Sequence, residues 1–432
     1  MCPVLSVQLS GDAVQREQLI CDSFLRQFVA DPTVEPPFPL YAALRRVPPS
    51  YVPCHDVWLV SRYDDCVTIL KDPTSFAYWE AKEEFQDQLS GAVAAGNERP
   101  SRKGGATISE ESGDVAHTER QVMFYKALDL VRRLKDLDPQ ILPLANQLID
   151  GFAQDRGVEV ISRFAVPMVV TLISRLFGFP SSEWTRLINA WLEYLTPPTT
   201  DSSDRSKCNM ISELESASRA FRLHIASEVE NRHSGTHDDV VTAALVAPTD
   251  GQRLEVVDVL SFAEAVARNA VLTTTDFIGN ALLCFANQKN LCRKLSENPS
   301  LVPLALEEVL RLESPVQILR RRAVRDVRLG TTALARGARL LVIIGAANRD
   351  DSVFPDPDCF ELERHNVRDH LAFGYGMNVC LAAMMARRIA SVAVETILRR
   401  LNNLRLMPGR ELKRRHAKGN RGIYSLWLAF DG

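Results

Sequence analysis

The sequence lacks a long uninterrupted hydrophobic run. Hydrophobic residues make up 46% of its 432 residues, yet no apolar stretch reaches the roughly 18 residues that a membrane-spanning helix needs. The N-terminal residues also lack a charged start followed by an apolar run, so no signal peptide is expected. These absences predict a soluble protein without a membrane span.

An excess of one charge is also missing. The 51 Lys and Arg residues nearly balance the 54 Asp and Glu residues, which leaves a net charge of −3. A broad basic field, which nucleic-acid binding requires, is therefore absent. We interpret local basic clusters such as 320–322 as solvated faces or local anion contacts, and predict no nucleic-acid partner.

Cysteine pairs are missing as well. The nine cysteines are odd in number and scattered, and no CxxC pair occurs. This pattern argues against a disulfide framework and against a structural zinc site. It favours a reducing compartment, the cytoplasm, with most cysteines acting as small buried hydrophobes.

What the sequence does contain is mostly helical periodicity. Turn and loop residues at 197–207 interrupt this periodicity. The segments with a helical pattern are 121–195, 209–232, 255–285, 304–312 and 382–401.

Short strands and one long loop complete the pattern. Residues 56–70 begin as a strand and continue as a helix, while 338–348 and 422–430 are predicted strands. The polar, Gly/Ser-rich residues 84–115 are either a functional lid or a disordered segment. No repeat or linker divides the chain, so we expect one domain over 1–432, with its first 20 or so residues flexible.

The segment FGYGMNVCLA, at 373–382, carries the most information. Gly374 and Gly376 allow a close backbone approach and positive φ just before Cys380. A helix predicted directly after the cysteine, together with the loop amides, would favour a thiolate over a thiol. The alternative interpretation is a buried structural cysteine on a glycine-rich turn.

The same segment resembles the haem-binding signature of cytochromes P450, FGxGxxxCxG or FGxGxxxCxA. The resemblance implies haem b as cofactor and Cys380 as the axial iron ligand. It also implies that Phe373, Gly374, Asn378 and Ala382 line the haem. Asn378 occupies a position that family members usually fill with histidine.

A second motif lies upstream, where Glu308 and Arg311 share one face of a predicted helix. Such a pair alone is common and means little as a surface ion pair. Here it resembles the ExxR motif of the same family, and FELER supplies Arg364 at the place of the family's third partner. The resemblance implies that these three residues support the haem loop structurally.

The family also implies contacts to the haem propionates. Arg321 matches an arginine with this role, and His370 and His117 match two further contacts. A plain basic charge on an edge strand is the alternative for the neighbouring Arg320 and Arg322. Gln121 stands where an arginine often contacts a propionate.

The resemblance extends from about residue 52 to 430. It implies a mainly α fold, a single triangular helical domain with a small β region. It also implies a soluble, bacterial-type haem-thiolate monooxygenase. The sequence contains no reductase or ferredoxin segment, so a separate ferredoxin and ferredoxin reductase are the expected electron donors.

The distal helix departs from the family pattern. Where relatives read (A/G)Gx(D/E)T, this chain keeps Thr273 but has Leu272 in place of the acid. Thr273 is the predicted oxygen contact and Thr274 the fallback, whereas a threonine bonded back to its own helix is the structural alternative. Asp276 is interpreted as a poor substitute for the acid, because family members often have Asn there.

Leu272 leaves other functions open. One alternative is a haem-thiolate enzyme with non-standard chemistry: an isomerase, a dehydratase, a peroxide user or a nitrating catalyst. Another is a haem-binding recruitment or sensor protein without turnover. The resemblance suggests a small, largely hydrophobic substrate from secondary metabolism, in contact with Val271, Val316, Ile318, Leu319, Ile423 and Tyr424, each of which could equally be core.

Overall fold

A computed structural model describes most of the chain. The described residues are 19–21, 23–25, 38–78, 130–178, 181–194, 204–231, 267–376, 379–415 and 419–431. The predicted flexible N-terminus lies almost entirely outside them and the long loop at 84–115 does so completely, so both stay predictions. The single domain also stays a prediction.

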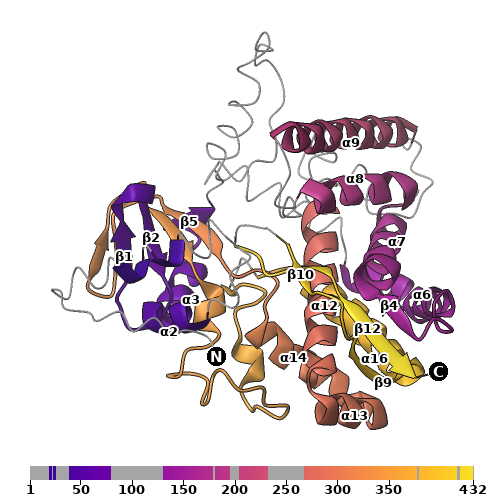
Figure 1. Ribbon diagram of the computed structural model, residues 1–432. Helices are drawn as coiled ribbons and strands as arrows, with labels where there is room; N and C mark the ends of the chain where they lie inside the picture. The colour runs from indigo at the N-terminus through magenta and orange to yellow at the C-terminus, as the bar shows by residue number, and fades with distance from the viewer. Residues whose placement is uncertain are drawn as a thin grey trace.

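The described residues are mainly helical, as predicted (Figure 1). The larger helices are α2 (Phe38–Arg45), α3 (Tyr63–Lys71), α6 (Leu130–Asp150), α7 (Val166–Phe177), α8 (Ser181–Tyr194), α9 (Asp204–Asn231), α12 (Leu272–Ala286), α13 (Lys289–Glu297), α14 (Val302–Leu312) and α16 (Ala383–Arg400). Short helices are η2 (Pro53–His55), η5 (Pro299–Leu301), α15 (Ile344–Ala347) and η6 (Val367–Asp369). Two π-helical turns, η3 (Ile161–Ala165) and η4 (Ala267–Val271), lead into α7 and α12.

Helix α12 runs through the middle of the molecule (Figure 1). It packs against α7, α13, α14 and α16, and buries almost every residue from Leu272 to Phe285. A helix that is buried on all sides needs apolar residues all round, and this one has them. Its buried polar residues, among them Thr274, Asp276 and Asn280, are therefore exceptions.

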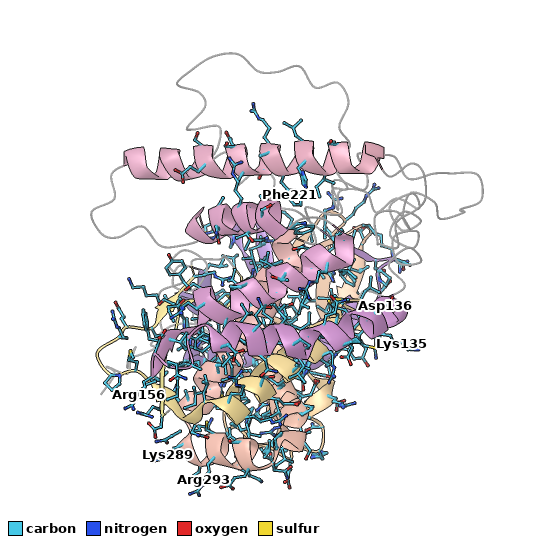
Figure 2. The ribbon with its side chains drawn as sticks, turned by 90° about the vertical axis from the view of Figure 1, so that its right-hand side faces the viewer. Lys135, Asp136, Arg156, Phe221, Lys289 and Arg293 are labelled. Carbon is cyan, nitrogen blue, oxygen red and sulfur yellow. The ribbon has the colours of Figure 1, made fainter. Side chains whose placement is uncertain are left out.

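Helices α8 and α9 lie across the upper end of α12 (Figure 1). Phe221 points from α9 toward α8 (Figure 2), where its ring meets the buried Trp184 edge to face at 5.0 Å. Helix α9 begins at Asp204, so the predicted loop at 197–207 was wrong at its end. Serine and aspartate favour helix starts as well as loops, so this composition does not locate the boundary between them.

The strands form four small sheets. The largest has the order β1-β2-β8-β5-β3, from β1 (Ser50–Val52), β2 (Val57–Val60), β8 (Arg339–Val342), β5 (Leu319–Ala323) and β3 (Phe76–Tyr78). A second sheet joins β4 (Gly157–Glu159), β12 (Trp427–Asp431) and β9 (Asn402–Leu406). The remaining pairs are β6 (Val327–Leu329) with β7 (Thr332–Leu334), and β10 (Lys413–Arg414) with β11 (Ile423–Ser425).

Two strand predictions needed correction. The segment 338–348 is a strand only as far as Val342, after which Ile344–Ala347 form α15. The segment 422–430 is divided at Leu426 into β11 and β12, which pair with different partners. The apolar run at 338–348 is too short for periodicity to separate strand from helix.

In the part of the chain that the structure describes, no helix is both long and apolar enough to cross a membrane. The seven cysteines whose side chains the structure describes are all free thiols.

Candidate active site

The loop before α16 presents Cys380. Gly374 and Gly376 both have positive φ, 78° and 68°, which L side chains rarely adopt. Gly376 also lies so close to α3 that an added Cβ would be 3.4 Å from the Cα of Lys71. The backbone N–H of Cys380 donates to the carbonyl of Phe373 at 2.7 Å, which closes the loop.

Cys380 is exposed as a residue, but protein surrounds much of its sulfur. This desolvation raises the pKa of the thiol, while backbone N–H groups of Ala382 and Ala383 and the charge of Arg387 lower it in part. The loop amides therefore act in the predicted direction, although desolvation outweighs them and the net shift is upward.

Glu308, Arg311 and Arg364 come together behind this loop. Glu308 accepts Nε and Nη2 of Arg311 at 2.8 and 2.7 Å, and Nε of Arg364 at 3.2 Å. All three side chains are buried. The two guanidiniums also donate to main-chain carbonyls of 355–359, so the network fixes this irregular segment.

A second network was missed at the sequence level. Glu307 accepts Nε and Nη2 of Arg387 at 2.6 and 2.8 Å, and its Oε2 lies 3.2 Å from Nε2 of His370. The guanidinium of Arg387 stacks 4.4 Å from the ring centroid of Phe373. The network joins α14 and α16 to both ends of the cysteine loop.

These contacts bear on the predicted role of His370. Its Nδ1 accepts the backbone N–H of Ala372 at 3.3 Å, so both ring nitrogens have protein partners. The predicted propionate contact of His370 stays a prediction. No local motif marks Glu307, which simply precedes the ExxR glutamate, and only the acidic doublet Glu307–Glu308 hints at it.

Arg321 lies on the inner face of the largest sheet. Its side chain is 1% exposed, and its guanidinium stacks 3.9 Å from the ring centroid of Tyr78, its cross-strand partner in β3. Its Nη1 donates to the carbonyl of Arg320 at 2.8 Å. A buried cation of this kind suits an anionic partner such as a propionate.

The predicted oxygen-contact residues lie where the π-helical turn η4 passes into α12. The Thr273 hydroxyl donates to the carbonyl of Asn269 at 2.6 Å, the back-bonded arrangement typical of a helical threonine. Thr273 is partly exposed, whereas Thr274 is 6% exposed. Leu272 is buried, so this turn presents an apolar side chain next to Thr273.

The predicted substrate contacts divide into two groups. Val271 and Ile423 are fully buried in the main hydrophobic core. The partly exposed residues are Val316, Ile318, Leu319 and Tyr424. The predicted haem contacts His117 and Asn378 lie outside the described residues.

Comparisons with known proteins agree with this geometry. A family model described as cytochrome P450 matches residues 283–422, the part that carries both motifs. Cytochrome P450 107B1 from Saccharopolyspora erythraea is 30% identical over 353 residues, which cover 81% of this chain and 83% of that relative. The chain belongs to the cytochrome P450 family. It is a haem-thiolate monooxygenase, and the cofactor of its family is haem b.

Solved cytochrome P450 structures share the fold. CYP109Q5 from Chondromyces apiculatus matches with a TM-score of 0.77 at 27% identity, over 93% of this chain and 97% of that one. P450BioI, in complex with an acyl carrier protein ligated to hexadec-9Z-enoic acid, matches with a TM-score of 0.75 at 26% identity. That match covers 94% of this chain and all of the other.

Proposed function

We propose that this cytochrome P450 inserts one oxygen atom of dioxygen into a small, largely hydrophobic organic substrate. Electrons come from a separate ferredoxin and ferredoxin reductase. One observation carries the proposal: Cys380 is a free thiol that receives two backbone N–H groups and lies on a closed, anchored loop. This is the environment that a thiolate ligand of haem iron requires.

The residues present fit haem b. Cys380 would hold the iron, because it is a free thiol and, although burial raises its pKa, the backbone N–H groups of Ala382 and Ala383 act in the opposite direction and would stabilise a thiolate. Arg321 would neutralise a propionate from the inner face of the sheet. Bound haem supplies dioxygen activation, and the protein supplies orientation and proton access.

The surface beside the cysteine suits an electron donor. Val379, Leu381 and Met384 are 45%, 37% and 49% exposed, which is unusual for such apolar side chains. The basic side chain of Arg388 lies one turn along α16 from Met384, paired with Asp138. An apolar centre with charged residues at its rim is typical of a transient protein interface.

The test is donor-dependent incorporation of labelled oxygen. The protein is reconstituted with a ferredoxin, its reductase and ¹⁸O₂, using hexadec-9Z-enoic acid, free or on an acyl carrier protein, and apolar secondary metabolites as probes. We expect one labelled oxygen atom in the product and none without electron donors. Product formed without donors would instead support isomerase or dehydratase chemistry. A reduced protein that forms no oxygen adduct would support a binding protein without turnover.

Leu272 gives a prediction about proton supply. A leucine cannot relay a proton, so we propose that the substrate or ordered water supplies it beside Thr273. Leu272→Glu is then expected to change the fraction of consumed electrons that reach product, measured as product formed per NADPH oxidised. Leu272→Gln is the matched control, because it is polar without being acidic. If Leu272→Glu changes neither the product formed per NADPH oxidised nor the rate of product formation, the proposal of substrate assistance is contradicted.

A further inference from the structure

Asp276 is a carboxylate buried in the central helix. Its side chain is 5% exposed, and it lies three residues, about one turn, beyond Thr273. Its Oδ1 is 3.0 Å from Nη1 of Arg415 and accepts the backbone N–H of Ile423 at 3.3 Å. Helix α12 is thus tied to the C-terminal hairpin β10–β11 by an ion pair and a hydrogen bond.

Arg415 completes the connection from the hairpin. Its side chain is 1% exposed, and its Nη2 donates to the carbonyl of Ile423 at 3.0 Å. The backbone N–H of Arg415 donates to the carbonyl of Gly422 at 3.2 Å. Both carboxylate oxygens of Asp276 would lie 2.5 Å from a Cβ at position 422, so a glycine there makes room for the carboxylate.

Stability alone is a weak reason for such a pair. Two desolvated charges repay their dehydration only with good geometry, and an apolar pair of similar size often does as well. An apolar pair cannot form directional hydrogen bonds. It would therefore not fix the main chain of Ile423, which is now bonded at both its N–H and its carbonyl. The arrangement therefore constrains the position and register of β11, the strand that carries the partly exposed Tyr424.

We propose that Asp276 is a positioning residue which, through Arg415, holds β11 and Tyr424 beside the distal helix and so sets how tightly an apolar ligand binds there. This inference rests on the proposed function, because it assumes that the ligand binds beside Thr273. It makes Asp276 a determinant of binding rather than a replacement for the missing acid.

The test compares two azoles of different size on the haem-loaded protein. Imidazole is too small to reach beyond the iron, whereas 4-phenylimidazole carries an apolar ring into the distal space. We expect Asp276→Asn to weaken 4-phenylimidazole binding about tenfold, measured from the shift of the Soret band, and to change imidazole binding less than twofold. Asp431→Asn is the matched control, since it neutralises the exposed partner of Arg405 and should change neither.

The structural part of the inference has its own readout, independent of any ligand. Hydrogen exchange at the Ile423 amide should become faster in Asp276→Asn, because the acceptor of that N–H loses its charge, and should stay unchanged in Asp431→Asn. If Asp276→Asn does not fold, Asp276→Leu with Arg415→Met removes both charges together and is expected to show the same two effects.

The pH dependence separates positioning from simple packing. Burial raises the pKa of Asp276 to about 6, against the opposing charges of Arg415 and Arg414 and the N–H of Ile423. The wild type should therefore bind 4-phenylimidazole more tightly than Asp276→Asn above about pH 6, and this difference should disappear as pH falls through about 6. The ratio of the two affinities is the measured quantity, because it cancels protonation of the azole itself.

Three results would overturn the inference. They are equal 4-phenylimidazole affinity in Asp276→Asn and wild type, unchanged exchange at Ile423, and a wild type that binds both azoles equally. A wild type that gives no Soret shift with imidazole would instead contradict the haem site. Failure of the inference and failure of the proposed function are thus distinguishable.

Discussion

Replacing Cys380 with alanine is expected to remove the red-shifted Soret band of the reduced, carbon monoxide-bound protein and to reduce donor-dependent turnover to background. The sulfur is the donor atom that the loop presents, and its two N–H contacts come from Ala382 and Ala383. An alanine cannot push electron density toward bound dioxygen, which is the role of the thiolate in this family.

The stability of the haem-free chain should hardly change in Cys380→Ala. Removal of the sulfur should cost about 1 kcal/mol or less, because the loop is closed by main-chain bonds rather than by the thiol. The matched control is Cys359→Ala, which removes another exposed free thiol. Retention of the shifted band in Cys380→Ala, or its loss in Cys359→Ala, would contradict the ligand assignment.

The sequence predicted the parts of the site that depend on short-range spacing. Glu308 and Arg311 are three residues apart on one helix, so their pairing follows from helical geometry. Gly374, Gly376 and Cys380 lie within one loop, and their spacing predicted a tight turn in front of a helix. Each of these signals is local, and local geometry is what a sequence pattern specifies.

The contacts that the sequence missed join distant segments. Glu307 and Arg387 are 80 residues apart, and Asp276 and Ile423 are 147 apart. No periodicity relates such positions, and each partner alone reads as an ordinary charged or apolar residue. The requirement for glycine at position 422 could not be predicted either, because it comes from the Asp276 carboxylate, which lies on another element.

Desolvation explains why the loop amides, which lower the pKa of Cys380 as predicted, do not determine its net shift. The sequence shows the amides and the helix start, which lower the pKa of Cys380. It does not show how much protein surrounds the sulfur, which raises the pKa and has the larger effect.

Replacing Glu308 with glutamine is expected to lower the free energy of unfolding by about 3–5 kcal/mol. Glu308 is fully buried and also accepts the backbone N–H of Glu361 at 3.0 Å. Glutamine has a similar size but no charge, so it leaves the guanidinium of Arg311 buried without its counter-ion and leaves Arg364 with only the more exposed Glu361, 3.3 Å away. Because a domain is stable by only about 5–15 kcal/mol, urea unfolding should show a markedly lower midpoint.

Glu307→Gln is the matched comparison, because it makes the same change at the neighbouring position. Its partner Arg387 has a side chain 36% exposed, so water can solvate that charge and the loss should be only about 1–2 kcal/mol at neutral pH. Burial alone would raise the pKa of Glu307, but hydrogen bonds from His370 and Arg387 outweigh it and lower the pKa to about 2. The stabilisation from Glu307 is therefore present above about pH 4.5 and is lost as pH falls toward 2.

The difference in free energy of unfolding between wild type and Glu307→Gln should accordingly disappear in acid. At neutral pH, both proteins should be more stable than Glu308→Gln. Equal unfolding midpoints for the two glutamine variants at neutral pH would show that the buried Arg311–Glu308–Arg364 network does not hold the segment 355–361. The cysteine loop would then depend on the Glu307 network and its own main-chain bonds, because those are its remaining ties to α14 and α16.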